Sequence, residues 1–269
     1  MNIFLTGGSG FIGKNFINLA LDHGHKIFAV SRVKRKNKKN LVWLKGKIDK
    51  DWNELKNSSI LVHMASAGVE NQDLSIEECL RVNVFQSSKL LLNAYKAGCK
   101  KWVIIGTSSE FGDTLKNKKK VSINSVKKPN NNYGLSKHVF SEIVINLAKK
   151  LKINCRYARL FQVYGKYEKK NRLFSSLKFI KKNKDFYIKN PYSIRDFISA
   201  NQVVKKVLEM TKFNKKPTTQ VWHIASGKPI SIKDFVKLHI DSKKKTNLKI
   251  NRKKINFENH ISDKKSLWQ

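Results

Sequence analysis

The chain has 269 residues, enough to bury a sizeable core, and its hydrophobic content of 40% excludes a disordered protein. Its formal net charge of +37 favours anionic partners, such as nucleic acid, anionic membranes or nucleotides. No apolar run reaches the length of a membrane span, the N-terminal segment lacks the pattern of a signal peptide, and three widely spaced cysteines predict neither disulfides nor a metal site, so we expect a reduced, cytoplasmic protein.

The positive charge has a second explanation in the composition. Lysine accounts for most of the 56 basic residues, and asparagine, isoleucine and phenylalanine, which share its AT-rich codons, are also plentiful. The lysine runs at 34–39, 116–120, 181–184 and 243–245 carry few aromatic residues, which is typical of solvated loops and helix ends. We therefore do not expect a nucleic-acid or membrane partner, and a nucleic-acid-binding protein on the same fold stays a remote alternative.

Strands and helices alternate over the first 165 residues. Apolar strands are predicted at 2–7, 25–32, 41–46, 59–67, 101–109 and 153–161, and amphipathic helices at Phe11–His23, Ile76–Ala97 and Tyr133–Lys150. The run at 101–109 is continuously apolar, which is typical of a strand that is buried on both faces. The alternation predicts an α/β fold, a Rossmann-type doubly wound parallel sheet with helices on both faces.

The pattern loosens after Gly165. A helix is predicted at 171–182, short strands at 184–190 and 220–226, and a further helix near Ser231, whose spacing to Asp234 is that of a helix start. The lysine-rich tail from about 241 gives no prediction. We expect a Rossmann domain over 1–165 and a smaller substrate-binding lobe over 166–269, with about 193–225 returning to the first domain, and the lobe at the carboxyl edge of the sheet.

A glycine-rich stretch, "TGGSGFIG", follows the first predicted strand and opens the first helix. Gly7, Gly10 and Gly13 have the spacing of a dinucleotide turn, in which the backbone approaches a pyrophosphate and the helix N-terminus supplies positive potential. The second strand ends at Ser31 and Arg32, with no acid to bind the ribose hydroxyls of NAD. We therefore expect NADP(H) as the preferred cofactor, with NAD(H) as the alternative.

The segment "NYGLSK" places Tyr133 and Lys137 one helical turn apart. A phenol titrates near pH 10, and a neighbouring ammonium lowers that pKa towards the range of proton transfer at neutral pH. Such a pair also occurs by chance on helix surfaces. Here Thr107 closes the strand at 101–109, where its hydroxyl can hold the same substrate oxygen, and Asn83 lies on the helix before that strand.

These motifs together resemble the extended short-chain dehydrogenase/reductase superfamily, in the branch of nucleotide-sugar epimerases, dehydratases and reductases. The resemblance runs from Met1 to about Gly227 and rests on "TGGSGFIG", "VHMASA", "RVNV", "GTSSEFG", "YGLSK", "RLFQVYG", "RDF" and "IASGK" in family order. It implies that Tyr133, Lys137 and Thr107 are catalytic and that the protein is a homodimer through 76–97 and 133–150. It implies cofactor contacts at Gly7, Gly10, Phe11, Ile12, Gly13, Ser31, Arg32, Ala65, Asn83 and Lys137, and substrate contacts at Ser108, Ser109, Gln162, Arg172 and Arg195.

The sequence departs from the dehydratases of this family. They carry an Asp-Glu pair or a Glu after the catalytic threonine, where this chain has Ser108 and Ser109. Glu110 comes one step later, which in extended backbone points to the opposite side. We therefore expect no dehydration but reduction of a nucleotide-linked 4-keto-6-deoxyhexose by NADPH, in the synthesis of deoxysugars for surface polysaccharides. Epimerisation at C4 with bound NAD is the alternative.

Overall fold

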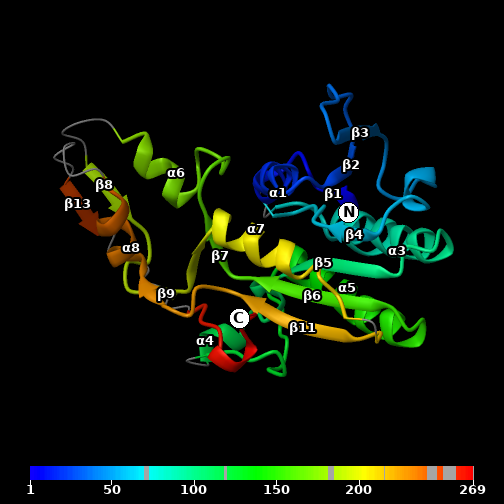
Figure 1. Ribbon diagram of the computed structural model, residues 1–269. Helices are drawn as coiled ribbons and strands as arrows, with labels where there is room; N and C mark the ends of the chain where they lie inside the picture. The colour runs from blue at the N-terminus through cyan, green and yellow to red at the C-terminus, as the bar shows by residue number, and fades with distance from the viewer. Residues whose placement is uncertain are drawn as a thin grey trace.

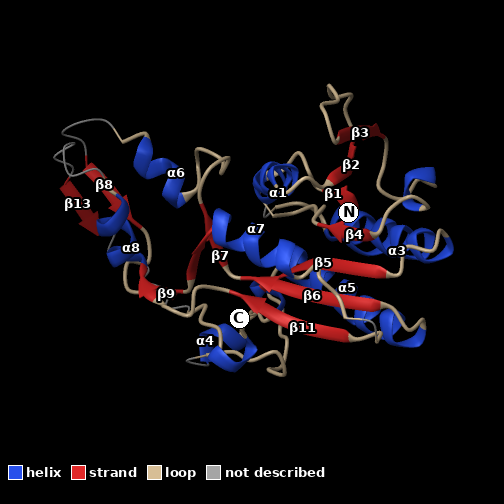
Figure 2. Ribbon diagram, in the orientation of Figure 1, coloured by secondary structure: helices blue, strands red, loops and turns tan. Residues whose placement is uncertain are grey.

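A seven-stranded parallel sheet in the order β11-β6-β5-β4-β1-β2-β3 forms the centre of the computed structural model (Figures 1 and 2). The order reverses between β1 and β4, which opens a crevice at the carboxyl ends of these strands, where doubly wound sheets bind ligands. The predicted fold class is therefore confirmed. In sheet order the strands are β11 (Thr219–Ile224), β6 (Asn154–Leu160), β5 (Lys101–Thr107), β4 (Ile60–His63), β1 (Asn2–Thr6), β2 (Lys26–Ser31) and β3 (Leu41–Lys45).

The structure describes residues 1–69, 73–117, 120–180, 185–214, 216–240, 247–250 and 259–268. The lysine runs at 181–184 and 243–245 lie outside these ranges, as does part of the run at 116–120. Within the described ranges, no helix is long and apolar enough to span a bilayer.

Helices cover both faces of the sheet because side chains alternate along each strand. Ile3 and Leu5 of β1 join the core under α1 (Phe11–Asp22) and α7 (Ala200–Glu209). Phe4 points the other way, into the core under α3 (Ser87–Lys96) and α5 (Asn132–Lys150). The sheet is therefore the middle layer of three, and its strands are buried on both faces.

The helix predicted at Ile76–Ala97 is present but changes pitch in its middle. It begins as α2 (Ile76–Leu80), continues through six residues of π-helix, η2 (Arg81–Gln86), and ends as α3. Ser75 starts it by accepting a 3.2 Å hydrogen bond from the backbone N–H of Glu78. The wider turn carries Asn83, and π-helical turns are frequent at functional sites.

The smaller elements form a lobe at the left of Figure 1 and four short helical turns. Leu177, Ile188 and Val236 form the small core of the lobe. Ser231 starts α8 by accepting a hydrogen bond from the Asp234 N–H, as its spacing predicted. The lobe elements are β7 (Gln162–Tyr164), α6 (Leu173–Lys178), β8 (Asp185–Ile188), β9 (Ile194–Arg195), β10 (Phe197–Ser199), β12 (Ile230–Ser231), α8 (Ile232–His239) and β13 (Asn247–Ile250). The turns are η1 (Asn53–Leu55), η3 (Ser108–Glu110), α4 (Thr114–Asn117) and η5 (Lys264–Ser266).

Candidate active site

The glycine turn joins β1 to α1 and lies against the end of β4. Gly7 has a φ of +73°, and a Cβ on it would lie 2.6 Å from the Ala65 backbone nitrogen. A Cβ on Gly13 would lie 2.2 Å from the Gly7 carbonyl oxygen. Only glycine therefore allows the first turn of α1 to approach the ends of β1 and β4 so closely.

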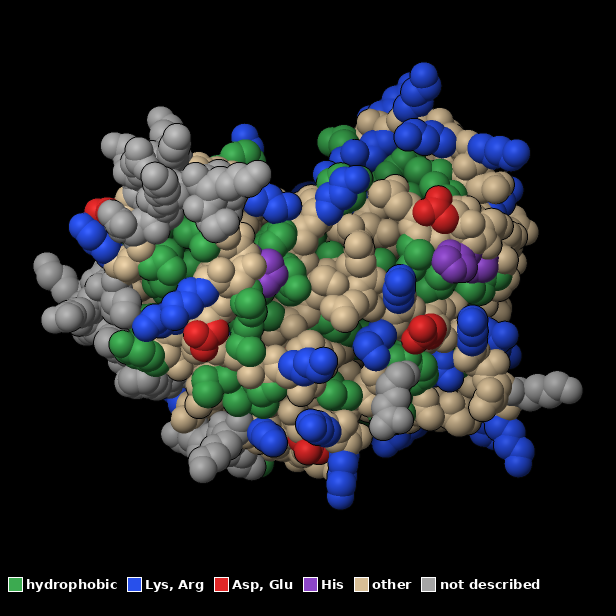
Figure 3. Space-filling view, turned by 60° about the vertical axis from the view of Figure 1, so that its left-hand side comes forward, with side chains coloured by type: hydrophobic (Ala, Val, Ile, Leu, Met, Phe, Trp, Pro, Cys, Tyr) green, Lys and Arg blue, Asp and Glu red, His purple; other side chains and the backbone are tan. Residues whose placement is uncertain are grey.

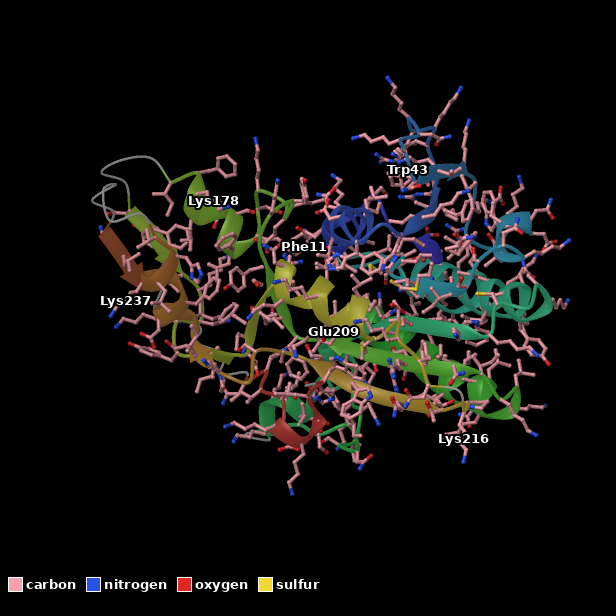
Figure 4. All side chains as sticks on the ribbon, viewed as in Figure 1. Phe11, Trp43, Lys178, Glu209, Lys216 and Lys237 are labelled. Atoms are coloured by element: carbon pink, nitrogen blue, oxygen red, sulfur yellow. The ribbon has the colours of Figure 1, made fainter. Side chains whose placement is uncertain are left out.

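The N-terminus of α1 is open to a ligand. Gly10 precedes the helix without any side-chain cap, and Phe11 and Ile12 are its first two residues. The first backbone N–H groups of α1 and its positive dipole end therefore lie at the crevice of the sheet. A pyrophosphate fits this cradle, and Phe11 marks its place in Figure 4.

The loop after β2 is positively charged at its surface. Ser31 is buried at the end of the strand, and its Oγ accepts hydrogen bonds from Arg35 Nε at 3.1 Å and from the Val33 N–H at 3.3 Å. The Arg35 guanidinium lies over the ring of Trp43 at 5.1 Å. Arg32 is exposed beside it. This loop holds cationic donors and no carboxylate at the place where a cofactor ribose binds in such folds.

Tyr133 lies in the first turn of α5, beside the end of β5. Asn131 starts the helix by accepting a 2.7 Å hydrogen bond from the Gly134 N–H. A Cβ on Gly134 would lie 2.5 Å from the Ser109 carbonyl oxygen, so glycine is needed for this helix to reach the strand end. The hydroxyl groups of Thr107 and Ser66 lie near enough to the Tyr133 phenol to lower its pKa. Three separate elements therefore bring three hydroxyl groups to one point.

Lys137 lies one turn further along α5 and is buried. Its Nζ donates a 2.7 Å hydrogen bond to the Ile105 carbonyl oxygen, and burial lowers its pKa to about 8. The expected lowering of the Tyr133 pKa was wrong for this structure, because burial is the largest influence and raises it to about 12. Desolvation of the phenol therefore outweighs the neighbouring hydroxyl groups that favour the phenolate, and Tyr133 is protonated at neutral pH.

Asn83 is committed to protein groups. Its Oδ1 accepts hydrogen bonds from the Ala67 N–H at 2.7 Å and from Ser66 Oγ at 3.0 Å, and its Nδ2 donates to Ser136 Oγ at 2.9 Å. The π-helical turn thereby fixes Ser66 and the loop after β4 against α5. A direct contact between Asn83 and a cofactor stays a prediction.

The residues after the threonine differ in burial and direction. Ser108 is 3% exposed, and Ser109 Oγ lies 3.3 Å from Thr107 Oγ1. Glu110 is fully buried and turns away from the site to pair with Arg159, with 2.6 Å between Oε2 and Nε. Glu110 does not lie in the extended backbone that we expected but in the 3₁₀ turn η3, where its Oε1 accepts a 3.0 Å hydrogen bond from the Thr107 N–H.

A cavity of about 110 Å³ lies in the lobe, and it brings together three of the five predicted substrate residues, Gln162, Arg172 and Arg195. Figure 3 shows that the surface is hollowed between the lobe and the part of the molecule that holds the sheet. Far more basic than acidic side chains lie around this hollow. Arg172 is near enough to Tyr133 to lower the pKa of the phenol. Thr107 and Tyr133 themselves are not part of the cavity wall.

Sequence reasoning missed several residues of this site. Ser66 was not singled out, although its hydroxyl group donates a hydrogen bond to Asn83. Glu168 lies in the cavity wall with Arg172 Nε 3.3 Å from its Oε1. The remaining wall is apolar and largely aromatic, and Phe197 stacks on Phe235 with 3.8 Å between ring centroids. The sequence pattern gave little indication of these residues, because they lie in short elements and loops that have no clear hydrophobic periodicity. The aromatic side chains are Tyr164, Phe174, Phe197 and Phe235.

Known proteins share this architecture over most of the chain. The sequence is 24% identical over 282 residues to a dTDP-6-deoxy-L-talose 4-dehydrogenase (NAD(+)) of Aggregatibacter actinomycetemcomitans, which covers 100% of this chain and 99% of that protein. It is 28% identical to a GDP-6-deoxy-D-talose 4-dehydrogenase of the same organism, over 80% of this chain and 74% of that protein. The solved structure of MoeE5 in complex with UDP-glucuronic acid and NAD has a TM-score of 0.83 and 21% identity, covering 98% of this chain and 90% of that one.

The family follows from a match along most of the sequence. Residues 3–225 match the model of the "NAD dependent epimerase/dehydratase family", which spans the glycine turn, the Thr107–Tyr133–Lys137 group and all seven sheet strands. The chain therefore belongs to the NAD-dependent epimerase/dehydratase family, of the extended short-chain dehydrogenase/reductase type.

Proposed function

We propose that this protein reduces the 4-keto group of a nucleotide-linked 6-deoxyhexose, in the synthesis of deoxysugars for surface polysaccharides. The observation that carries the proposal is the grouping of the Thr107 and Ser66 hydroxyl groups around the buried Tyr133 phenol, one helical turn from Lys137, with the charge of Arg172 from the lobe cavity also acting on the phenol. Two relatives named as 4-dehydrogenases of 6-deoxyhexose nucleotides support the position of the chemistry on the sugar.

Each residue of the group has a distinct task in this reaction. The bound cofactor supplies hydride to the carbonyl carbon. Tyr133, neutral because its pKa is about 12, donates the proton to the carbonyl oxygen, and Thr107 holds that oxygen by a hydrogen bond. Lys137 lies one turn away as a buried cation and stabilises the phenolate that remains after proton transfer.

The residues after Thr107 support reduction over dehydration. Elimination of water requires an acid and a base beside the sugar, whereas Ser108 and Ser109 carry hydroxyl groups that stay neutral. Glu110 follows them, but its carboxylate is bound by Arg159, Tyr157 and the Thr107 N–H. The proposed reaction therefore consumes one reduced cofactor for each sugar.

We propose NADPH as the preferred cofactor. Ser31, Arg32 and Arg35 offer a hydroxyl group and two guanidinium groups to a 2′-phosphate. The loop contains no carboxylate, which is the group that would bind the ribose hydroxyls of NAD. The preference is measured by comparing kcat/KM with NADPH and NADH in the wild type and in Arg32→Asp. We expect the ratio to fall at least tenfold in the variant, and an unchanged ratio would contradict the assignment.

We propose that residues 166–269, with 193–225 returning to the sheet side, supply the substrate lobe. Gln162, Arg172 and Arg195 would bind the nucleotide and its phosphates, since guanidinium groups match phosphate geometry. We also propose a cytoplasmic homodimer through the helices 76–97 and 133–150. Phe85, Leu92 and Leu135 support this surface, because each is at least 41% exposed and apolar. Light scattering of Phe85→Lys tests it, with loss of the dimer expected.

The function is tested by mixing the protein with NADPH and a panel of nucleotide 4-keto-6-deoxyhexoses. Loss of reduced-cofactor absorbance that depends on one sugar supports the reductase and identifies its substrate. The second candidate, a 4-epimerase, is supported by the likeness in fold to a solved UDP-N-acetylglucosamine 4-epimerase, with a TM-score of 0.82. It would consume no added cofactor, would release NAD⁺ on denaturation, and would act on ordinary nucleotide sugars.

A further inference from the structure

Beneath the candidate active site lies a buried ion pair that the mechanism above does not use. Glu110 is 0% exposed and Arg159 is 1% exposed, and they join η3 to β6 through the 2.6 Å contact between Oε2 and Nε. A buried charge is costly unless it is paired and hydrogen-bonded. The pair was not expected from the sequence, because its members are 49 positions apart.

The other carboxylate oxygen of Glu110 is bonded to the frame of the site. Its Oε1 accepts hydrogen bonds from the Thr107 N–H at 3.0 Å and from Tyr157 Oη at 2.7 Å. Thr107 Oγ1 in turn accepts from the Ser109 N–H, which closes a reciprocal capping box around η3. Glu110 therefore fixes the backbone from which the Thr107 hydroxyl reaches Tyr133, and its own oxygens do not reach the cavity.

The Glu110–Arg159 pair also influences the pKa of the titratable groups beneath the site. Glu110 raises the pKa of both Lys137 and Tyr133, because a fixed negative charge stabilises the ammonium and opposes the phenolate. The titratable groups that face the pair from the surrounding elements are Lys127, Tyr133, Lys137, Tyr157 and His223. Burial holds the pKa of His223 at about 3, so this ring stays neutral beside Arg159.

We propose that Glu110, held by Arg159, is a positioning residue for the reaction: it fixes the backbone of Thr107 at the end of β5 and places a negative charge beneath Tyr133 and Lys137. The inference rests on the proposed function. Glu110 does not touch the substrate in this account. It acts through its neighbours, which do. Removing the charge should therefore change the pH range of turnover and not only its rate.

The test compares Glu110→Gln with the wild type by two measurements. The first is kcat against pH with NADPH and the sugar that the panel identifies, and the second is the NMR titration of the ¹³Cε resonance that disappears in Lys137→Met. The amide oxygen can still accept from the Thr107 N–H, so the change is mainly one of charge. Both transitions should move to lower pH by about one unit. Glu209→Gln, which removes an exposed carboxylate on α7 (labelled in Figure 4), should move neither.

A second variant keeps the test valid if Glu110→Gln does not fold. Glu110→Gln/Arg159→Met removes both buried charges and leaves neither unpaired, and it should show the same shift of both transitions. Unchanged transitions in the folded variants, with kcat lowered equally at every pH, would overturn the proposal. If the wild type reduced no sugar of the panel, the proposed function would fail, whereas the Lys137 titration needs no substrate and would still support or overturn the role of Glu110.

Discussion

Lys137 of α5 donates a 2.7 Å hydrogen bond to the carbonyl of Ile105 in β5, two residues before Thr107. The buried ammonium is thereby fixed to the strand that carries the candidate threonine, while its own helix carries Tyr133. One cross-layer contact therefore sets the geometry of all three residues. It also explains why the helix needs Gly134 near its start, since the helix must lie against the end of β5.

The titration of Lys137 should limit turnover at high pH. Burial lowers its pKa to about 8, so the ammonium loses its proton above that value and no longer stabilises a phenolate at Tyr133. We expect kcat to fall above about pH 8. Lys137→Met should lower kcat about 100-fold below pH 8, with a smaller deficit above it, whereas Lys149→Met, at the exposed end of the same helix, should match the wild type. A flat wild-type profile between pH 7 and pH 10 would contradict this role.

Gly13→Ala should abolish cofactor binding. The added Cβ would lie 2.2 Å from the Gly7 carbonyl oxygen, and this backbone atom can move only if the glycine turn opens. Titration of NADPH and NADH by calorimetry measures the effect, and we expect at least a 100-fold weaker Kd. Gly24→Asn is the control, because Gly24 has a φ of +71° with no atom within 4 Å of a Cβ, and asparagine tolerates that backbone. Equal affinity in Gly13→Ala would exclude this cradle.

Arg172→Gln should weaken substrate binding and leave the cofactor unaffected. Its guanidinium borders the cavity and is held by Glu168, so its loss removes a charged hydrogen bond to a phosphate. Such a bond contributes about 1.5–3 kcal/mol, and we expect KM for the sugar nucleotide to rise about 10- to 100-fold. Arg81→Gln, which removes an exposed arginine paired with Glu78, is the matched control. A rise in the NADPH Kd of equal size would place Arg172 at the cofactor instead.

Arg159→Met should destabilise the protein far more than the paired change. It leaves the Glu110 carboxylate buried without its cation, which costs about 3–5 kcal/mol of unfolding free energy. In Glu110→Gln/Arg159→Met no charge is left buried, so the loss should be at least about 2 kcal/mol smaller. Urea unfolding of the single and double variants measures both values. Equal or additive losses would show that the two side chains are not coupled.

Local sequence patterns predicted those parts of the site whose residues lie close together in the sequence. The glycine turn follows from three glycines between a strand and a helix, and the Tyr133–Lys137 pair follows from spacing within one helix. Chain order and continuous apolar strands also predicted the parallel sheet. In each case the residues concerned are near one another in the sequence, so their relative positions follow from the periodicity of one helix or strand.

Features that depend on distant contacts could not be predicted. Glu110 and Arg159 meet only because β5 and β6 are neighbours in the sheet, although an arginine inside the apolar strand "INCRYARLF" signals that it needs a buried partner. The pKa of Tyr133 depends on how deeply α5 buries it, which helical spacing does not reveal. The aromatic cavity is formed by short elements that become adjacent only in the folded lobe.

The most direct test of the account measures cofactor and sugar together. Wild type and Tyr133→Phe are mixed with NADPH and each nucleotide 4-keto-6-deoxyhexose, and NADPH loss and the reduced sugar are quantified. We predict one NADPH consumed for each sugar reduced by the wild type, with kcat at least 1000-fold lower in Tyr133→Phe and NADPH affinity retained. Turnover by Tyr133→Phe at the wild-type rate, or a changed sugar without NADPH loss, would contradict the assignment of this site as a tyrosine-dependent reductase.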